Sequence, residues 1–139
     1  MNNQLDYIIE ECSVHHDSRG ALIQFISDES LNKSDLTFGQ VYLITFDGTG
    51  VIRGNHYHNR SGEVFCVIQG SVEIRLENID TKSRFQKIFE ANENGFFKIT
   101  IGPRIAHTLI SISKNPIVIS LSTERYKPND EDKTPYILT

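Results

Sequence analysis

The stretch Gly50-Val-Ile-Arg-Gly-Asn-His56-Tyr-His58-Asn-Arg-Ser-Gly-Glu63-Val-Phe-Cys-Val-Ile-Gln-Gly70 combines two histidines, one carboxylate and a frame of glycines in a predicted strand–turn–strand. His56 and His58 are two residues apart, so on a β-strand both side chains leave the same face. Glu63 follows a short polar turn, on a strand that can pair back antiparallel. The pattern therefore predicts three ligand groups that converge on one point, as in a metal site or a catalytic site.

The composition of the chain limits what such a site can serve. Its 139 residues are the length of one domain, and we expect a single domain over residues 1–139. With 14 Lys and Arg against 18 Asp and Glu, the formal net charge is −4, which predicts neither a nucleic-acid surface nor a polybasic membrane patch. No apolar run approaches the roughly 20 residues that span a bilayer. The polar N-terminus does not resemble a signal peptide, so we expect a cytoplasmic protein that binds neither nucleic acid nor membrane.

Short β-branched and aromatic runs recur between turn residues, which predicts an all-β domain. Strands are expected at residues 7–11, 21–26, 40–46, 51–58, 63–68, 71–77, 84–89, 95–101, 107–113 and 117–123. A helical turn is expected only within residues 28–36. The tail at residues 127–133 is expected to be irregular, with Pro128 and Pro135 blocking regular pairing. So many short strands in one domain favour a closed sandwich or barrel, which hides strand edges.

A further ligand candidate is His107, which follows Gly102-Pro-Arg-Ile-Ala106 at the start of a predicted strand. A Gly-Pro turn fixes where such a strand begins, and one more nitrogen ligand would complete the first cluster. Cys12 and Cys66 lack metal-ligand spacing, and a disulfide is not expected. Cys66 lies among apolar residues, so we expect a buried and unreactive thiol.

The spacing Gly50-x5-His56-x-His58-x4-Glu63-x6-Gly70 resembles the first motif of the cupin superfamily at every position, and Gly102-Pro103-x3-His107 resembles the second motif less closely. The resemblance implies a double-stranded β-helix, the cupin or jelly-roll barrel. It also implies a divalent metal bound inside that barrel by His56, His58, Glu63 and His107. Three nitrogens and one oxygen suit Zn, Ni, Fe or Mn, and spacing alone does not choose among them. No organic cofactor is expected.

Further segments are similar to cupins that act on nucleotide-linked sugars, namely deoxythymidine-diphosphate-sugar 3,5-epimerases, 3,4-ketoisomerases and the C-terminal cupin of capsular-polysaccharide reductase/epimerases. These segments are Asp17-Ser-Arg19-Gly20, Phe38-Gly-Gln-Val41, Arg53-Gly-Asn-His56-Tyr-His58 and the tail from Ser122 to Tyr136. The similarity is closest to the capsular cupin. It implies an epimerase or isomerase of a keto nucleotide-sugar in surface-polysaccharide biosynthesis, which removes a proton next to a ketone.

The resemblance assigns catalytic roles in part. In the rhamnose-pathway epimerases the histidine that resembles His56 is the base, and a tyrosine on the strand before the tail is the acid. Ser120 stands at that tyrosine position here, so Tyr57, Tyr126 and Tyr42 are the alternatives for the acid. His56 can be read as a metal ligand or as the base, because a metal-bound imidazole has little capacity left to accept a proton.

The resemblance also implies binding partners. Arg53 resembles the family arginine near the diphosphate, where a guanidinium can hold a phosphate with two hydrogen bonds, and Arg19 is interpreted in the same way. Family members are usually dimers, so we expect strands within residues 5–26 to cross to a partner subunit. The expected partners are a nucleotide-diphosphate sugar, a second copy of the chain and a sugar-nucleotide reductase.

Functions of another class stay open on sequence alone. The chain could be a metal cupin that senses or binds a small molecule, which predicts tight binding without turnover. It could also be a cupin dioxygenase, which predicts iron and oxygen-dependent turnover. In a third interpretation the metal only holds the barrel together, and replacing His58 would then lower stability without a specific loss of chemistry.

Overall fold

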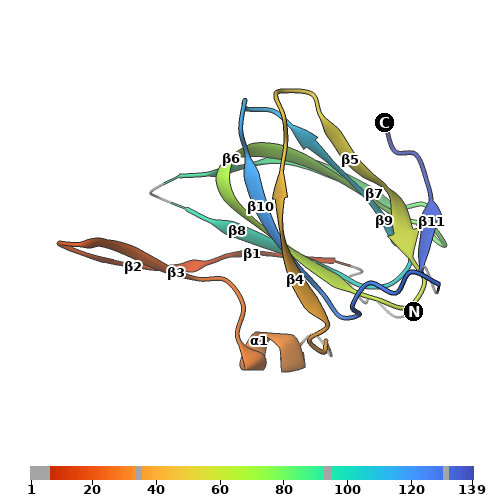
Figure 1. Ribbon diagram of the computed structural model, residues 1–139, viewed down its shortest axis with the longest axis horizontal. Helices are drawn as coiled ribbons and strands as arrows, with labels where there is room; N and C mark the ends of the chain where they lie inside the picture. Colours follow the sequence, from red (N-terminus) through yellow and green to blue (C-terminus); the bar gives the residue numbers. More distant parts are fainter. Residues whose placement is uncertain (1–6, 34–35, 93–94, 130–131) are drawn as a thin grey trace.

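The computed structural model describes residues 7–33, 36–92, 95–129 and 132–139, and nearly all of its regular structure is β (Figure 1). One antiparallel sheet contains β4 (Gln40–Thr45), β10 (Ile117–Ser122), the first half of β6 (Glu63–Asn78), β8 (Phe97–Ile101) and β1 (Tyr7–Glu11). The other contains β7 (Arg84–Ala91), the second half of β6, β9 (Ile105–Ser111), β5 (Ile52–His58) and β11 (Lys133–Pro135). The two sheets close into the predicted double-stranded β-helix barrel.

Strand β6 belongs to both sheets and joins them. Residues 63–67 pair with β8 and β10, whereas residues 70–78 pair with β7 and β9. Gly70 lies where the strand changes sheets and has a φ of 72°. A Cβ atom there would lie 2.4 Å from Oγ of Ser113, so both the backbone angle and the space require glycine. The two strands that the sequence predicted on either side of Gly70 are therefore one continuous strand with a bend.

Alternation along β6 separates two buried clusters. Phe65 and Val67 point into the barrel, where the core also contains Val72, Ile74, Leu76, Phe89 and Ile99. Val64 and Cys66 point the other way and pack against Phe25 and Ile26. Burial raises the pKa of the Cys66 thiol to about 12, which confirms the predicted buried thiol. Because Glu63 has the parity of Phe65, its carboxylate also points into the barrel.

The N-terminal region differs from the prediction. Residues Ser13–Asp17 form a strand, β2, that pairs with β3 (Gly20–Gln24) in a hairpin, and this hairpin projects away from the barrel (Figure 1). The sequence predicted no strand at residues 13–17, because His15, His16 and Asp17 give that segment no apolar alternation. The expected helical turn is present as α1 (Asp28–Lys33). Among the described residues, no helix has the length and apolar character needed to cross a membrane.

The C-terminal tail is irregular over the described residues 127–129 and 132, as predicted, but a strand, β11 (Lys133–Pro135), begins at its last residue. Strand β11 pairs antiparallel with β5, with Lys133 opposite His58 and Pro135 opposite His56. Pro135 does not block this pairing, because it is the last residue of an edge strand, where a missing N–H can be tolerated. The tail is therefore held against the strand that carries two of the candidate ligands.

Two glycines of the opening motif differ in how closely other atoms surround them. Gly54 has a φ of 95°, and a Cβ there would lie 2.6 Å from the backbone oxygen of His107. Gly50 has a φ of 73°, but nothing lies within 4 Å of the same added atom. We expect Gly54→Ala to lower the free energy of unfolding by about 2 kcal/mol more than Gly50→Ala, measured by urea denaturation, since only Gly54 adds overpacking to backbone strain. Equal losses in the two variants would contradict this account.

Candidate functional site

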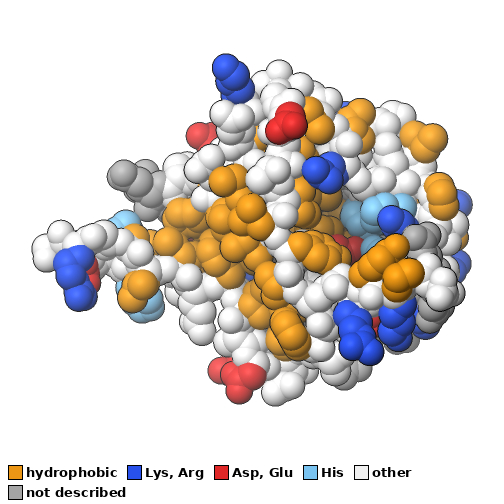
Figure 2. Space-filling view, in the orientation of Figure 1, with side chains coloured by type: hydrophobic (Ala, Val, Ile, Leu, Met, Phe, Trp, Pro, Cys, Tyr) orange, Lys and Arg blue, Asp and Glu red, His pale blue; other side chains and the backbone are white. Residues whose placement is uncertain are grey.

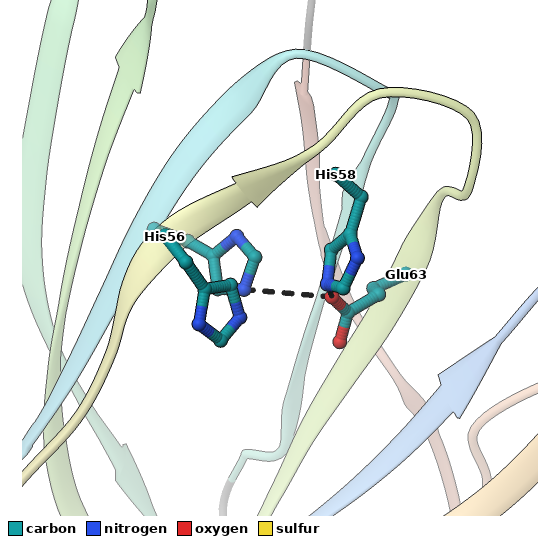
Figure 3. A group of neighbouring side chains, drawn as sticks. His56, His58 and Glu63 are labelled. Carbon is teal, nitrogen blue, oxygen red and sulfur yellow. Dashed lines mark ion pairs between the residues drawn. The ribbon is translucent and has the colours of Figure 1, made fainter. Parts of the chain in front are cut away.

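Four side chains from three strands meet inside the barrel. His56 and His58 leave the same face of β5, and Glu63 begins β6 after the turn at residues 59–62 (Figure 3). His107 lies on β9, directly opposite His56 in the β5–β9 pairing. One ligand atom from each of the four residues lies within 4.8 Å of the others. The structure thus brings together all four ligands that the motifs predicted.

The carboxylate of Glu63 is central to the cluster, and only 6% of this side chain is exposed. Its Oε1 lies 2.7 Å from Nε2 of His58 and 3.4 Å from Nε2 of His107. The shorter distance suits a hydrogen bond, but the directions do not, and Oε1 makes no hydrogen bond within the described part of the chain. A buried carboxylate oxygen without a donor is costly. A cation placed between this oxygen and the imidazole nitrogens would compensate for it.

Two contacts orient the ligands from behind. Oγ of Ser120 donates to Oε2 of Glu63 at 3.3 Å, which leaves Oε1 to face the histidines. Nδ1 of His107 lies 3.1 Å from the carbonyl oxygen of Ile105. If Nδ1 carries the proton and donates a hydrogen bond to that carbonyl, Nε2 keeps a lone pair that faces the cluster. This is the usual second contact of a metal-binding histidine.

The electrostatics favour neutral imidazoles at His56 and His107 beside an ionised carboxylate at Glu63. Burial, together with the neighbouring His107 and His58, lowers the pKa of His56 to about 3. Burial also lowers the pKa of His107. For Glu63, burial alone would raise the pKa, but the interactions of the carboxylate with His107 and His58 outweigh burial and lower the pKa. These are the protonation states that metal ligands need, and the donor set fits a divalent ion such as Zn, Ni, Fe or Mn.

The cluster opens into a cavity of about 440 Å³ at one end of the barrel, a size that suits a small ligand. In Figure 2 histidine and acidic side chains appear together on this face, beside basic side chains. Around the cluster the cavity is lined by Tyr42, Arg53, Arg125, Tyr126, Lys127 and Lys133. Glu124 and Asp132 also line the cavity, so the site combines the ligand cluster with four basic and two further acidic side chains.

The structure brings some of the other predicted site residues to this cavity. Arg53 lines it, and its Nε donates to the carbonyl oxygen of Thr45 at 3.0 Å. Tyr126 lines the mouth and is largely exposed. Both residues are thus placed where a bound molecule would meet them.

Two predicted site residues are not brought to the cavity of their own chain. Alternation along β5 turns Tyr57 away from the two histidines, and its ring lies 6.0 Å from that of Tyr136. Tyr57 is absent from the described residues that line the cavity. Arg19 lies at the tip of the β2–β3 hairpin, where its side chain is 87% exposed and pairs with Asp17.

Sequence reasoning left the place of Tyr42 in the cavity open and missed the contribution of Lys133. Tyr42 on β4 lies directly opposite Ser120 on β10, and directly opposed residues share a face of the sheet. Its side chain therefore enters the cavity beside Ser120, and burial, followed by the charge of Glu63, raises its pKa. Lys133 lines the cavity from a tail that was expected to be irregular. The register of β4 against β10 could not be read from the sequence, although Tyr42 was one of the named alternatives.

Solved structures share this fold at low sequence identity. A dTDP-4-dehydrorhamnose 3,5-epimerase from Bacillus anthracis, crystallised with TDP and PPi, is 18% identical with a TM-score of 0.84, over 99% of this chain and 82% of that one. A 3,4-ketoisomerase from Helicobacter canadensis is 22% identical with a TM-score of 0.76, over 94% and 91%. The capsular polysaccharide assembling protein CapF from Staphylococcus aureus is 20% identical with a TM-score of 0.66, over 91% of this chain but 34% of its own.

The family assignment comes from a separate comparison. No curated protein matches the chain. The family model for the polysaccharide biosynthesis C-terminal domain matches residues 15–134, which include the whole ligand cluster and most of the barrel. The chain belongs to the family of polysaccharide biosynthesis C-terminal domains.

Proposed function

We propose that this protein is a metal-containing epimerase or isomerase of a keto nucleotide-sugar in surface-polysaccharide biosynthesis. The observation that carries the proposal is the cluster of three imidazoles and a buried carboxylate at the base of a basic cavity. The family and the shared fold support it, because the similar structures include a 3,5-epimerase and a 3,4-ketoisomerase. Residues 1–139 would act as a single cupin domain.

The proposed substrate is a nucleotide-diphosphate sugar. Arg53, Arg125, Lys127 and Lys133 line the cavity and can offset the charge of a diphosphate, with the arginines also able to bind it through paired hydrogen bonds. The cavity leads from this basic mouth to the ligand cluster. A sugar attached to the diphosphate would therefore extend toward His56 and Glu63. A ChmJ 3'-monoepimerase from Streptomyces bikiniensis, 16% identical with a TM-score of 0.80, is itself crystallised with dTDP-quinovose.

The chemistry requires an acid, a base and a stabilised enolate oxygen, since a proton leaves the carbon next to a ketone and one returns to the same or the next carbon. A divalent ion held by His56, His58, Glu63 and His107 would supply a Lewis acid for that oxygen. The geometry favours His56 as a ligand, because one of its ring nitrogens lies within 4.8 Å of the ligand atoms of the other three residues. Proton transfer then falls to other side chains that line the cavity.

We assign the acid role to Tyr42. The resemblance places the acid of related epimerases at the position of Ser120, and Tyr42 reaches the same part of the cavity from the neighbouring strand. Tyr126 lies farther out, at the exposed mouth. Tyr57 faces away from the cavity, against Tyr136. Replacing Tyr42 should therefore affect the reaction more than replacing either of the other tyrosines.

Isotope exchange tests the reaction and the acid together. In D2O, incubation with a panel of dTDP- and UDP-4-keto sugars should place deuterium on a carbon next to the ketone, detected by NMR and mass spectrometry. We expect Tyr42→Phe to lower turnover about 100-fold or more, as for loss of a general acid, while Tyr57→Phe stays close to wild type. Absence of exchange across the panel would reject the function. Oxygen-dependent turnover with iron would point to a dioxygenase, and tight binding without exchange to a sensor.

Metal analysis tests the ligand set. The purified protein should contain one divalent ion per chain, and Glu63→Gln should abolish it because the variant removes the anionic ligand. His15→Gln is the matched control, since His15 lies on the projecting hairpin. Elemental analysis and thermal melting with and without chelator give the readouts. Metal retained in Glu63→Gln would contradict the proposed site.

We further propose a homodimer in which the β2–β3 hairpin crosses to the partner. Within the described ranges the hairpin pairs with no strand of its own barrel, and a two-stranded hairpin alone is marginally stable. Leu22 on β3 is 73% exposed, and β4 exposes Val41 and Leu43. If the hairpin crosses, it carries Arg19 toward the partner, where Arg19 would bind the substrate in the partner's cavity. A sugar-nucleotide reductase remains a proposed partner on the resemblance alone.

Light scattering on the purified chain tests the dimer. The wild type should have the mass of two chains, and Leu22→Glu should shift it toward one chain, because a charge would then be buried in the contact. Asp17→Asn, near the hairpin tip, serves as the control for a surface change on the same hairpin. A monomeric wild type would reject this arrangement.

A further inference from the structure

The turn at residues 59–62 has candidate ligands at both of its ends. His58 precedes it and Glu63 follows it, and the facing atoms of these two side chains lie 2.7 Å apart. Any movement of the turn would therefore change the spacing of two ligands at once. The groups that hold this turn in place therefore influence the geometry of both ligands.

Three of the four backbone N–H groups of the turn point to one carboxylate, that of Asp132, and the fourth, of Gly62, donates to Oγ1 of Thr123. Its Oδ1 accepts from the N–H groups of Asn59 and Arg60, each at 3.0 Å. Its Oδ2 accepts from the N–H of Ser61 at 2.8 Å, from the Ser61 hydroxyl at 3.1 Å and from the N–H of Arg60 at 3.0 Å. One side chain thus binds three successive amides, which fixes the conformation of the turn.

Asp132 is itself held in place. Its side chain is 8% exposed, and its backbone oxygen accepts from the N–H of Asn59 at 3.2 Å. The next residue, Lys133, pairs with His58 in the β11–β5 ladder. The carboxylate of Asp132 therefore has little freedom to move, because it is buried and the next residue is paired with the candidate ligand His58. Hydrogen bonds to a charged carboxylate are also stronger than those between neutral groups.

We propose that Asp132 is a positioning residue, which fixes the turn between His58 and Glu63 and so sets the affinity of the cluster for a divalent ion. This inference rests on the proposed metal site but not on any reaction. It adds the C-terminal segment, more than 70 residues along the chain from the turn, to the parts of the molecule that determine the site.

The matched control is Glu124, which contacts the same turn in a different way. Its carboxylate accepts from Nε and Nη2 of the Arg60 side chain, both at 3.3 Å, and makes an ion pair with it that is partly exposed. Glu124→Gln removes the same charge as Asp132→Asn close to the same residue. It leaves the acceptors of the backbone N–H groups intact, so a difference between the two variants reports on the turn.

The test uses metal alone, without any sugar nucleotide. Competition with a chromophoric chelator gives the Kd for Zn²⁺, and the visible spectrum of the Co²⁺ form reports on ligand geometry. We expect Asp132→Asn to weaken Zn²⁺ binding about 10- to 100-fold, as for the loss of an outer contact to a ligand, and to alter the Co²⁺ spectrum. Glu124→Gln should change the Kd by about twofold or less, as for an exposed ion pair.

The outcomes separate this inference from the proposed function. Wild-type affinity and an unchanged Co²⁺ spectrum in Asp132→Asn would overturn the role of Asp132 while leaving the metal site in place. If Asp132→Asn does not fold, Ser61→Ala removes the hydroxyl bond to the same carboxylate and should weaken Zn²⁺ binding severalfold; an unchanged Kd would overturn the inference. A protein that binds Zn²⁺ as expected but exchanges no proton rejects the reaction alone.

Discussion

The carboxylate of Glu63 is buried inside an apolar barrel, and the rest of the site is arranged around this charge. Its position follows from the alternation of β6, which sends Glu63 in the same direction as Phe65 and Val67. The alternation of one strand, β6, therefore places both core side chains and the carboxylate of the site inside the barrel. A buried charge must be paired or bound to a cation. Three histidine rings meet that need only in part, because Oε1 still lacks a hydrogen-bond donor among the described residues.

Every ligand of the cluster lies on a strand, and the contacts behind the ligands come from other parts of the barrel. Ser120 on β10 orients Glu63, and the carbonyl oxygen of Ile105 orients His107. Asp132 holds the turn that connects β5 to β6. Sites built on rigid elements with supported ligands keep their geometry when they bind. This arrangement suits chemistry in which a small charge shift at one oxygen must be stabilised without reorganisation.

The resemblance of two motifs implied the barrel and its four candidate ligands, and local spacing alone predicted that three of the four converge. A spacing of two positions from His56 to His58 and a short turn before Glu63 are enough to make three side chains converge. The β2 strand was missed because its polar residues have no apolar alternation, and β11 was missed because a proline obscured its edge pairing.

Residues whose roles depend on distant partners could not be placed in this way. Tyr42 enters the cavity only because β4 pairs with β10 in one register, and Tyr57 leaves it because of its parity on β5. Asp132 acts across more than 70 residues of chain, so no local pattern marks it. In the proposed dimer Arg19 would act from a second copy of the chain, and the sequence of one copy cannot position it.

The central claim is that the cluster around Glu63 holds a divalent metal that the chemistry of the cavity uses. A crystal structure of the purified protein with anomalous data at the metal absorption edge tests it most directly. We predict one anomalous peak, about 2.0–2.2 Å from the nitrogen atoms of His56, His58 and His107 and from a carboxylate oxygen of Glu63. A protein that epimerises its 4-keto sugar nucleotide at full rate with no peak at this cluster would contradict the account.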